Sequence, residues 1–489
     1  MSGLECSEIT VKELDELQLR LDAEFYRKHN LKVVAMIDGL SHTTVENLKV
    51  VIDCSAFYPG VVDIYNFGGE GIPFIRVNEI TNFGLVSVTE ATAFLSKDFL
   101  DDNSATMARC KPGDIVIAKG GNTLAKTGIL NDNFSDYATC RDIVILRTDL
   151  LILPMKYYVW AYLQSDYGQT LLWQTASQTG QPHLTLEYIK KLKIPLFSDA
   201  FYGAIQYCYQ QSQSINETAN AKYKNAETLL LSALDLDTFT PSNENTSVKT
   251  FSQFTASGRL DAEYYQKKYD DLEEKLSRFP QVKIGDLVNY PVSSGSTPKA
   301  GSAEYYTDKV DGIPFIRAVN ITKSRVDTDD FVYVKPEVHN GLLRKTRLKK
   351  DDVLFSIAGT VGRCGIFDYD FEANINQAVS ILRFSEEKVK RLYLIQFFNS
   401  TAGKMIVEKY SRQGLQTNLN LDEVSALSIP IIDYAAQTKI STLVEQSFSL
   451  REKSKAMLKA ATRAVEIAIE QDEAAGVEFL REQQAVNNF

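Results

Sequence analysis

The sequence contains the same unit twice. Four blocks from the first half of the chain return in the second half, in the same order and at nearly the same spacing. The pairs are RLDAEFY at 20–26 with RLDAEYY at 259–265, GIPFIRVNEIT at 71–81 with GIPFIRAVNIT at 312–322, KPGDIVIAKGGNTLAKTGIL at 111–130 with KKDDVLFSIAGTVGRCGIF at 349–367, and SQTGQPHLTLEYIKKLKIPLF at 177–197 with SRQGLQTNLNLDEVSALSIPII at 411–432. Four ordered pairs exclude chance similarity. The 489 residues therefore predict two related globules rather than one large core.

A long stretch of helical character follows each copy. The segments at 200–234 and 435–471 contain no proline, and their apolar and small residues recur at the three-four spacing of one helical face. A helix of 35 residues is about 50 Å long at 1.5 Å per residue. Small residues on the face at 435–471 indicate close packing on a partner helix. The expected order is globule, long helix, globule, long helix.

The globules have the character of mixed α and β structure. Short runs rich in Val, Ile and Phe alternate with glycine and asparagine, as strands and turns do. We predict an α+β fold for two homologous domains, separated by two long helices that each pack on a partner helix. The predicted boundaries are 1–196 for the first domain, 197–236 for the central helix, 237–432 for the second domain and 433–489 for the C-terminal helix.

Composition narrows the class of protein only slightly. The net charge of −10 is unfavourable for a chain coated by nucleic acid, because neutralising phosphates needs Lys and Arg. Local basic patches, or basic partner subunits, remain compatible with DNA binding. No run approaches the roughly 20 apolar residues of a membrane span, and the acidic N-terminus is unlike a secretory signal. The six scattered cysteines predict reduced thiols of a cytoplasmic protein and no metal site.

The stretch DIVIAKGGNTLAKTGIL at 114–130 is close to a phosphate-binding loop but departs from it in two ways. Ala125 stands where that loop needs a glycine, and the turn-forming residues after Lys126 and Thr127 are poor helix material, whereas a phosphate loop opens a helix. The second copy has Arg363 and Cys364 at the positions of Lys126 and Thr127. What both copies share is a strand, a glycine-rich turn, a threonine and a cation. This pattern predicts a hairpin with a cationic tip.

Hairpin tips of this kind suit contact with a polyanion. Lys and Arg reach phosphates and guanine, and Asn and Gln pair with adenine. The candidate DNA contacts at the tips are Lys119, Asn122, Thr123 and Lys126 in the first copy, and Thr360 and Arg363 in the second. A solvated turn without a role is the alternative.

The block before the repeated Ile-Pro forms a second candidate site. An amide-rich loop broken by glycine, followed by a short helix, suits the reading of base edges. Its candidates are Gln178, Thr179, Gln181 and His183 in the first copy, and Arg412, Gln413, Gln416, Thr417 and Asn418 in the second. Thr185 and Asn420 are also expected to cap the helix that follows each loop. His183 is expected to be a hydrogen-bonding residue rather than a metal ligand, because no partner lies at ligand spacing.

A run of cations, RKTRLKK at 344–350, precedes a strand of the second copy. Arg344, Lys345 and Arg347 are candidates for phosphate contacts. The first copy has only Arg109 and Lys111 in this region, so the run is not a feature of both halves.

Taken together, the repeated blocks resemble those of specificity (S) subunits of type I restriction-modification systems. The carriers are RLDAE[FY]Y, GIPFIR, the strand-turn blocks at 111–130 and 349–367, and the glutamine-glycine loops closing on Ile-Pro; SGSTPK at 294–299 resembles a signature near the start of such domains. The resemblance covers nearly the whole chain. The first copy lacks the SGSTPK signature, so no site residue is placed in 54–70.

The resemblance implies a non-catalytic DNA-reading adaptor. Each of two target recognition domains would read half of a bipartite double-stranded DNA target. The two long helices, packed as an antiparallel coiled coil, would set the spacing and dock two methyltransferase (M) subunits. S-adenosylmethionine, ATP and Mg²⁺ would be bound by the M and restriction (R) subunits, with no cofactor in this chain. Two alternatives stay open: a related methylation or phage-defence adaptor without a restriction subunit, and a protein scaffold that does not bind DNA.

Overall fold

The computed structural model describes residues 6–15, 17, 19–56, 62–176, 182–244, 246–322, 324–412 and 417–487. Packing divides the chain into two compact units, one formed by residues 1–217 with 450–489 and the other by residues 218–449. The long helices α6 (Asp199–Ala233) and α14 (Tyr434–Glu470) each contribute residues to both units. Each unit thus consists of one globule and a stretch of each long helix.

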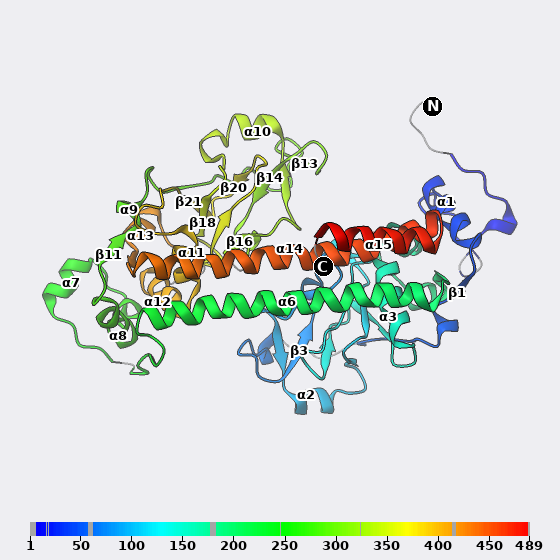
Figure 1. The fold of residues 1–489 in the computed structure, drawn as a ribbon, viewed down its shortest axis with the longest axis horizontal. Helices are drawn as coiled ribbons and strands as arrows, with labels where there is room; N and C mark the ends of the chain where they lie inside the picture. The colour runs from blue at the N-terminus through cyan, green and yellow to red at the C-terminus, as the bar shows by residue number, and fades with distance from the viewer. Residues whose placement is uncertain are drawn as a thin grey trace. The chain divides into compact units, whose positions relative to one another are not determined.

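The described residues of the first unit form three small sheets. Their strand orders are β2-β9-β6-β7, β4-β3-β8-β5 and β1-β10. The elements before the long helix are α1 (Lys28–Asp38), β1 (His42–Thr44), β2 (Val51–Cys54), β3 (Ile72–Ile75), β4 (Ala93–Leu95), α2 (Lys97–Asp102), β5 (Arg109–Cys110), β6 (Ile115–Ala118), β7 (Thr127–Ile129), β8 (Tyr137–Thr139), β9 (Ile143–Arg147), α3 (Leu153–Gln164), α4 (Asp166–Thr175), α5 (Leu186–Lys191) and β10 (Lys193–Pro195). Figure 1 shows α3 and the small sheets of this unit.

The second unit repeats this arrangement with additions. Its strand orders are β12-β21-β18-β19-β16-β15, β13-β17-β14-β20 and β11-β22. The elements are α7 (Phe251–Ser257), α8 (Lys267–Leu276), β11 (Gln281–Lys283), α9 (Ile284–Leu287), β12 (Ser293–Ser294), β13 (Tyr306–Thr307), β14 (Ile313–Ile316), β15 (Ile321–Thr322), β16 (Ser324–Val326), β17 (Val332–Val334), α10 (Pro336–Asn340), β18 (Asp352–Ser356), β19 (Cys364–Phe367), β20 (Asn374–Ile375), β21 (Val379–Leu382), α11 (Arg391–Asn399), α12 (Thr401–Tyr410), α13 (Leu421–Ala426) and β22 (Ser428–Pro430).

The topology confirms the duplication. The order β2-β9-β6-β7 in the first unit corresponds to β12-β21-β18-β19 in the second, and both contain the hairpin predicted from the glycine-rich block. Each unit also has one parallel pair that contains the repeated Ile-Pro-Phe-Ile strand: β3 with β8, and β14 with β20. The predicted α+β class is therefore confirmed for both halves.

A buried tyrosine on the first helix of each helix pair anchors the end of each globule. Tyr158 and Tyr393 are fully buried, and their hydroxyl groups donate hydrogen bonds to the carbonyls of Pro195 (2.7 Å) and Pro430 (2.6 Å). A buried hydroxyl needs such a partner to offset its loss of water. The bonds hold the repeated Ile-Pro segments, after which the long helices begin.

The helical stretch after the central strands is broken at one serine in each copy. Ser165 and Ser400 cap α4 and α12 by accepting hydrogen bonds from the backbone N–H of Gly168 (3.2 Å) and Gly403 (3.3 Å). Both glycines are needed for close approach, because an added Cβ would lie 2.2 Å from the Tyr162 carbonyl oxygen at Gly168 and 2.1 Å from the corresponding oxygen at Gly403. The serine-glycine pair therefore fixes how α4 and α12 turn away from the preceding helix.

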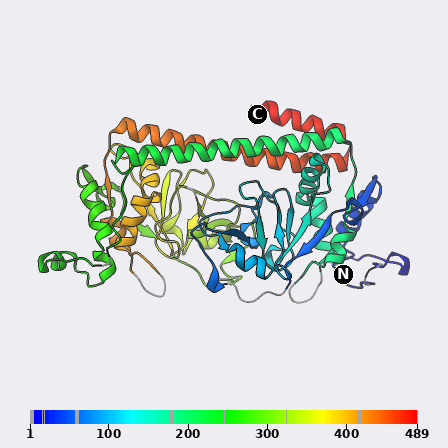
Figure 2. The same ribbon diagram turned by 90° about the horizontal axis from the view of Figure 1, so that it is seen from below.

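The long helices pack side by side and in opposite directions. Ser212 Oγ of α6 lies 2.8 Å from Ser454 Oγ of α14, and Lys222 of α6 donates to Gln446 of α14 at 2.8 Å. The residue number on α14 therefore falls as the number on α6 rises, so the two helices run in opposite directions. Figures 1 and 2 show a stretch of α6 beside a stretch of α14 in each unit. The predicted helical faces are confirmed by the burial of apolar and small residues at three-four spacing on both helices, including Ile205, Cys208, Ala219, Ile440, Met457, Ala461 and Ala464.

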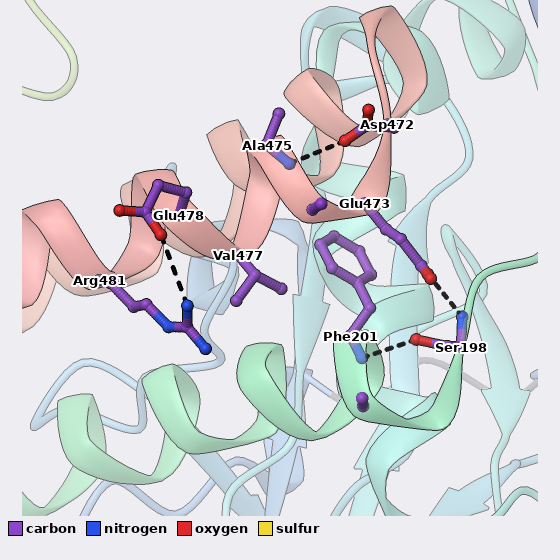
Figure 3. A pocket seen from close by; sticks show the side chains of 10 residues that line it. Ser198, Phe201, Asp472, Glu473, Ala475, Val477, Glu478 and Arg481 are labelled. Atoms are coloured by element: carbon purple, nitrogen blue, oxygen red, sulfur yellow. Dashed lines mark hydrogen bonds and ion pairs between the residues drawn. The ribbon is translucent and has the colours of Figure 1, made fainter.

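The C-terminal helix is not continuous through 433–489, which corrects the prediction. It breaks after Glu470, and α15 (Glu473–Asn487) begins with Asp472 accepting a hydrogen bond from Ala475 N–H at 2.9 Å. Helix α15 folds back, since a Cβ at Gly476 would lie 2.7 Å from the carbonyl oxygen of Ala464. Figure 3 shows this turn against the start of α6, around an open cavity of about 660 Å³.

No helix in the described part of the chain is both long and apolar enough to cross a membrane.

Two helical glycines of the first unit give opposite expectations for stability. Gly168→Ala places a methyl group against backbone and is expected to lower the free energy of unfolding by about 1–3 kcal/mol, as overpacking does. Gly203→Ala lies in α6 with no atom within 4 Å of the added Cβ and is expected to raise it by about 0.5–1 kcal/mol. Denaturant titration of both variants checks this pair, and a loss of stability in both would contradict the close approach at Gly168.

Candidate nucleic-acid interface

The glycine-rich block of each copy forms a β-hairpin with a tight, left-handed turn. Strand β6 pairs with β7, and β18 pairs with β19, both antiparallel. Gly121 (φ 69°) and Gly359 (φ 77°) occupy equivalent positions, and so do Ala125 (φ 63°) and Gly362 (φ 87°). Because a strand and not a helix follows Lys126, the phosphate-loop alternative is excluded by the structure.

In the first unit the hairpin tip lies against the end of the candidate loop. Gly120 forms an antiparallel bridge with His183, and Leu184 N–H donates to the Lys119 carbonyl at 2.8 Å. A Cβ at Gly120 would lie 2.5 Å from the His183 ring, so a larger residue at this position would require the His183 side chain to move. Two segments about 60 residues apart in the sequence, each a candidate site by itself, thus form one surface.

The second unit repeats this contact. Ala358 forms an antiparallel bridge with Asn418, and Leu419 N–H donates to the Ile357 carbonyl at 2.9 Å. Arg412 N–H in turn donates to the Asn418 carbonyl at 2.9 Å, which closes the base of the loop. The same joining of tip and loop in both copies defines the paired surface in each unit as the candidate interface.

The described candidate residues of this interface are accessible to solvent. His183, Thr360, Arg412 and Asn418 are exposed, and Lys119, Thr123, Lys126, Arg363 and Thr417 are half-buried. Among the described residues, no carboxylate forms an ion pair with Lys119 or Arg363. Gln178, Thr179, Gln181, Gln413 and Gln416 lie outside the described residues, as does the side chain of Asn122.

Arg412 is held by an acidic partner of the following helix. Its Nε donates to Glu423 Oε1 at 2.7 Å, while the Arg412 side chain stays 60% exposed and that of Glu423 is 12% exposed. The ion pair uses the Nε side of the guanidinium. This geometry suits an arginine that is pre-oriented from behind and presents its outer N–H groups to an acceptor.

The basic run at 344–350 belongs to a different place in the second unit. It precedes β18, whereas the hairpin tip follows β18, and a five-residue strand separates the two by about 17 Å at 3.3 Å per residue. Arg344, Lys345 and Arg347 are all exposed, but Arg347 donates to Asn340, and the nearby Lys350 pairs with Asp370 at 2.9 Å. The structure therefore does not bring this run together with the tip.

Of the two predicted helix caps, one is present. Asn420 Oδ1 accepts a hydrogen bond from Glu423 N–H at 2.7 Å, and Glu423 Oε2 accepts a hydrogen bond from Asn420 N–H at 2.8 Å. The cap predicted at Thr185 is wrong, because its Oγ1 is buried without a hydrogen-bond partner.

One feature near the interface was missed in the sequence. The arginines of the repeated RLDAE block, Arg20 and Arg259, bind the last carbonyls of α4 and α12, just before the two candidate loops. The repeated Arg-x-Asp pair at 20–22 and 259–261 was the signal in the sequence for this role.

The cavity at the turn between α14 and α15 is a poor match for DNA. Three carboxylates, Asp472, Glu473 and Glu478, line it together with a single cation, Arg481. Excess negative charge repels phosphate. None of the candidate residues lines this cavity.

Comparison with known proteins identifies a family that matches part of the chain. The type I restriction modification DNA specificity domain matches residues 277–460. The specificity subunit of the type I restriction enzyme EcoBI from Escherichia coli is 24% identical over 195 residues, which cover 39% of this chain and 41% of that protein. The match therefore spans about two fifths of the length of that relative.

Solved structures of the same kind are also similar. The S subunit of a type I restriction-modification system from M. genitalium has 12% identity and a TM-score of 0.38, covering 88% of this chain and 96% of that one. The HsdS subunit from Thermoanaerobacter tengcongensis has 13% identity and a TM-score of 0.27, covering 92% and 96%. The family resemblance predicted from the sequence is confirmed by the family match and the curated relative.

The difference between Asn420 and Thr185 can be tested by changing each of them. Asn420→Ala removes the hydrogen bond that caps α13 and is expected to lower the free energy of unfolding by about 1 kcal/mol. Thr185→Val removes a buried hydroxyl that has no partner and is expected to leave stability unchanged or raise it. Unfolding midpoints of the two variants measure the difference; equal losses would show that Thr185 makes a cap bond.

Proposed function

We propose that this chain, whose residues 277–460 belong to the type I restriction modification DNA specificity family, is the DNA-recognition subunit of a type I restriction-modification complex. Each half reads one part of a bipartite double-stranded DNA target. The chain itself is non-catalytic and positions methyltransferase and restriction subunits on the DNA.

The observation that carries the proposal is the repeated joining of tip and loop. In both units a cationic hairpin tip is hydrogen-bonded to the end of an amide-rich loop, through Leu184 and Lys119 in one and Leu419 and Ile357 in the other. Phosphate contacts fix position and base contacts carry sequence information. A surface that combines both kinds of group, present twice in one chain, suits a target made of two half-sites.

The candidate residues divide between these two tasks. Lys119, Lys126 and Arg363 would contact phosphates, and the run at Arg344, Lys345 and Arg347 would add contacts further along the DNA. Gln178, Thr179, Gln181 and His183 would read bases in one half-site. Arg412, Gln413, Gln416, Thr417 and Asn418 would read bases in the other, while Asn122, Thr123 and Thr360 would contact either groove or backbone. The different residues of the two loops suit two different half-site sequences.

The proposed partners supply the chemistry. Two M subunits would bind S-adenosylmethionine and methylate the target, and R subunits would use ATP and Mg²⁺. The long helices would set the spacer between the half-sites. A methylation or phage-defence adaptor without an R subunit differs only in its partners, and a protein scaffold predicts no sequence-dependent DNA binding.

Methylation mapping tests the function directly. Genomic DNA of the host is sequenced for modified bases with the gene intact, deleted and restored. Deletion is expected to abolish methylation at one bipartite motif, and the restored gene to recover it. A methylated motif that persists without the gene, or restored cells that lack any gene-dependent motif, would contradict the proposal.

The cations of the tips give a second prediction, measured on the complex purified through a tag on this chain. Lys119→Ala and Arg363→Ala are each expected to lower affinity for all sequences and to reduce the slope of log K against log salt by about 0.9, the value for one phosphate contact. Lys32→Ala and Arg278→Ala remove exposed cations of the same units away from the tips and should leave the slope unchanged. Equal slopes in all four variants would exclude phosphate contacts at the tips.

A further inference from the structure

The repeated RLDAE block contains a buried arginine clamp in the first unit. Arg20 is 8% exposed, and its Nε and Nη2 donate to the two carboxylate oxygens of Asp22, both at 2.7 Å. Its remaining N–H groups donate to the carbonyls of Thr175 (3.1 Å) and Ala176 (2.9 Å). The hydrogen bonds that Arg20 donates to the Asp22 carboxylate hold the pKa of Asp22 below its usual value. The clamp therefore consists of a fixed ion pair bound to the end of α4.

The second unit contains the same clamp. Arg259 donates to Asp261 at 2.7 and 2.6 Å, and to the carbonyls of Tyr410 (2.9 Å) and Ser411 (3.2 Å) at the end of α12. The last tyrosine of each block completes it, because the hydroxyls of Tyr26 and Tyr265 donate to the carbonyl of their own arginine at 2.9 and 2.8 Å.

The clamp supplies hydrogen-bond donors to the C-terminal end of a helix. The last carbonyls of a helix have no partner within it, and the negative end of the helix dipole favours a cation there. An arginine serves better than a lysine, because its planar fork can hold a carboxylate and carbonyls at once. The result is a helix end whose position is set by residues about 150 positions away in the chain.

These helix ends are where the candidate loops begin. Ala176 is the last described residue before the loop of the first unit, and Ser411 directly precedes Arg412 in the second. The other end of each loop is bonded to the hairpin tip through Leu184 or Leu419. Each loop is thus attached at both ends, to a clamped helix and to a strand pair.

In the second unit the clamp also reaches a candidate DNA-contacting side chain. Glu423 Oε1 lies 3.9 Å from Arg259 Nη1 and accepts the hydrogen bond from Arg412 Nε at 2.7 Å. Its other oxygen accepts from Asn420 N–H, which fixes the carboxylate on α13. Glu423 therefore connects the half-buried clamp of the second unit to the exposed Arg412.

We infer that Arg259 with Asp261 and Glu423, and Arg20 with Asp22, are positioning residues for sequence discrimination, each acting on the half-site read by its own unit. This inference rests on the proposed DNA-recognition function. The clamps touch no base themselves. They set where each loop leaves its helix and, through Glu423, how Arg412 is presented.

The test measures discrimination by the complex purified through a tag on this chain. Affinities are compared for the target found by methylation mapping, for duplexes with one base changed in either half-site, and for unrelated DNA. Arg259→Lys keeps the charge but loses the fork, and is expected to reduce discrimination about tenfold or more in one half-site, leaving the other half-site and the affinity for unrelated DNA unchanged. Arg20→Lys is expected to give the reverse pattern.

Two further variants separate positioning from folding. Arg383→Lys alters a comparable arginine fork in the second unit and should leave discrimination unchanged. Arg383 binds the buried Asp352 at the start of β18, whereas the hairpin tip follows the end of that strand. Glu423→Gln leaves the bonds between Arg259 and α12 intact and should reduce discrimination only at the base that Arg412→Ala also affects. Unfolding midpoints are recorded for every variant.

The outcomes distinguish the inference from the proposed function. If Arg259→Lys and Glu423→Gln lower the unfolding midpoint but keep full discrimination, or if they weaken both half-sites equally, the clamps only stabilise the fold and the inference fails. If the wild-type complex has no gene-dependent motif and does not discriminate between sequences, the proposed function itself fails.

Discussion

Two backbone hydrogen bonds determine what the interface can be. Leu184 N–H to the Lys119 carbonyl, and Leu419 N–H to the Ile357 carbonyl, join a hairpin tip to a loop that lies far along the chain. Each side of this contact by itself is an ordinary feature, a turn with a cation or a loop before a short helix. Once joined, they place cations, amides and hydroxyls on one surface. The surrounding structure, from the serine-glycine turns to the buried tyrosines, holds the helices and strands that keep these partners in register.

The acidic composition of the chain is compatible with the proposed DNA binding because of where its charges are paired. Several cations near the surface are neutralised by carboxylates, as Lys350 is by Asp370 and Arg109 is by Asp101. Lys119 and Arg363 have no such partner among the described residues. Net charge describes long-range attraction, whereas a contact depends on which cations are accessible at one place. A chain of net charge −10 can therefore present cations locally.

Much of the fold could be predicted, because duplication and hydrophobic periodicity are local properties of the sequence. The hairpins, the α+β class and the buried faces of α6 and α14 followed from them. What could not be predicted depended on tertiary contacts. The fold-back of α15 includes the close approach of Gly476 to the Ala464 carbonyl, and the hydroxyl of Thr185 is buried without forming the expected cap. The clamp of Arg20 depends on carbonyls about 150 residues away. The joining of tip and loop is of the same kind, since each segment was identified but their contact was not.

The left-handed turn at the hairpin tips shows how the two copies have diverged. One copy has Ala125 and the other has Gly362 at the same turn, and an alanine there is strained, whereas a glycine is not. By contrast, the arginine, aspartate and tyrosine of the clamps, and the serine-glycine pairs that start α4 and α12, are identical in both. Comparison of the two copies thus separates the positions that stayed the same after the duplication from those that changed. The halves agree at the clamp and serine-glycine positions of the shared scaffold, and they differ in the loops that we propose to read separate half-sites.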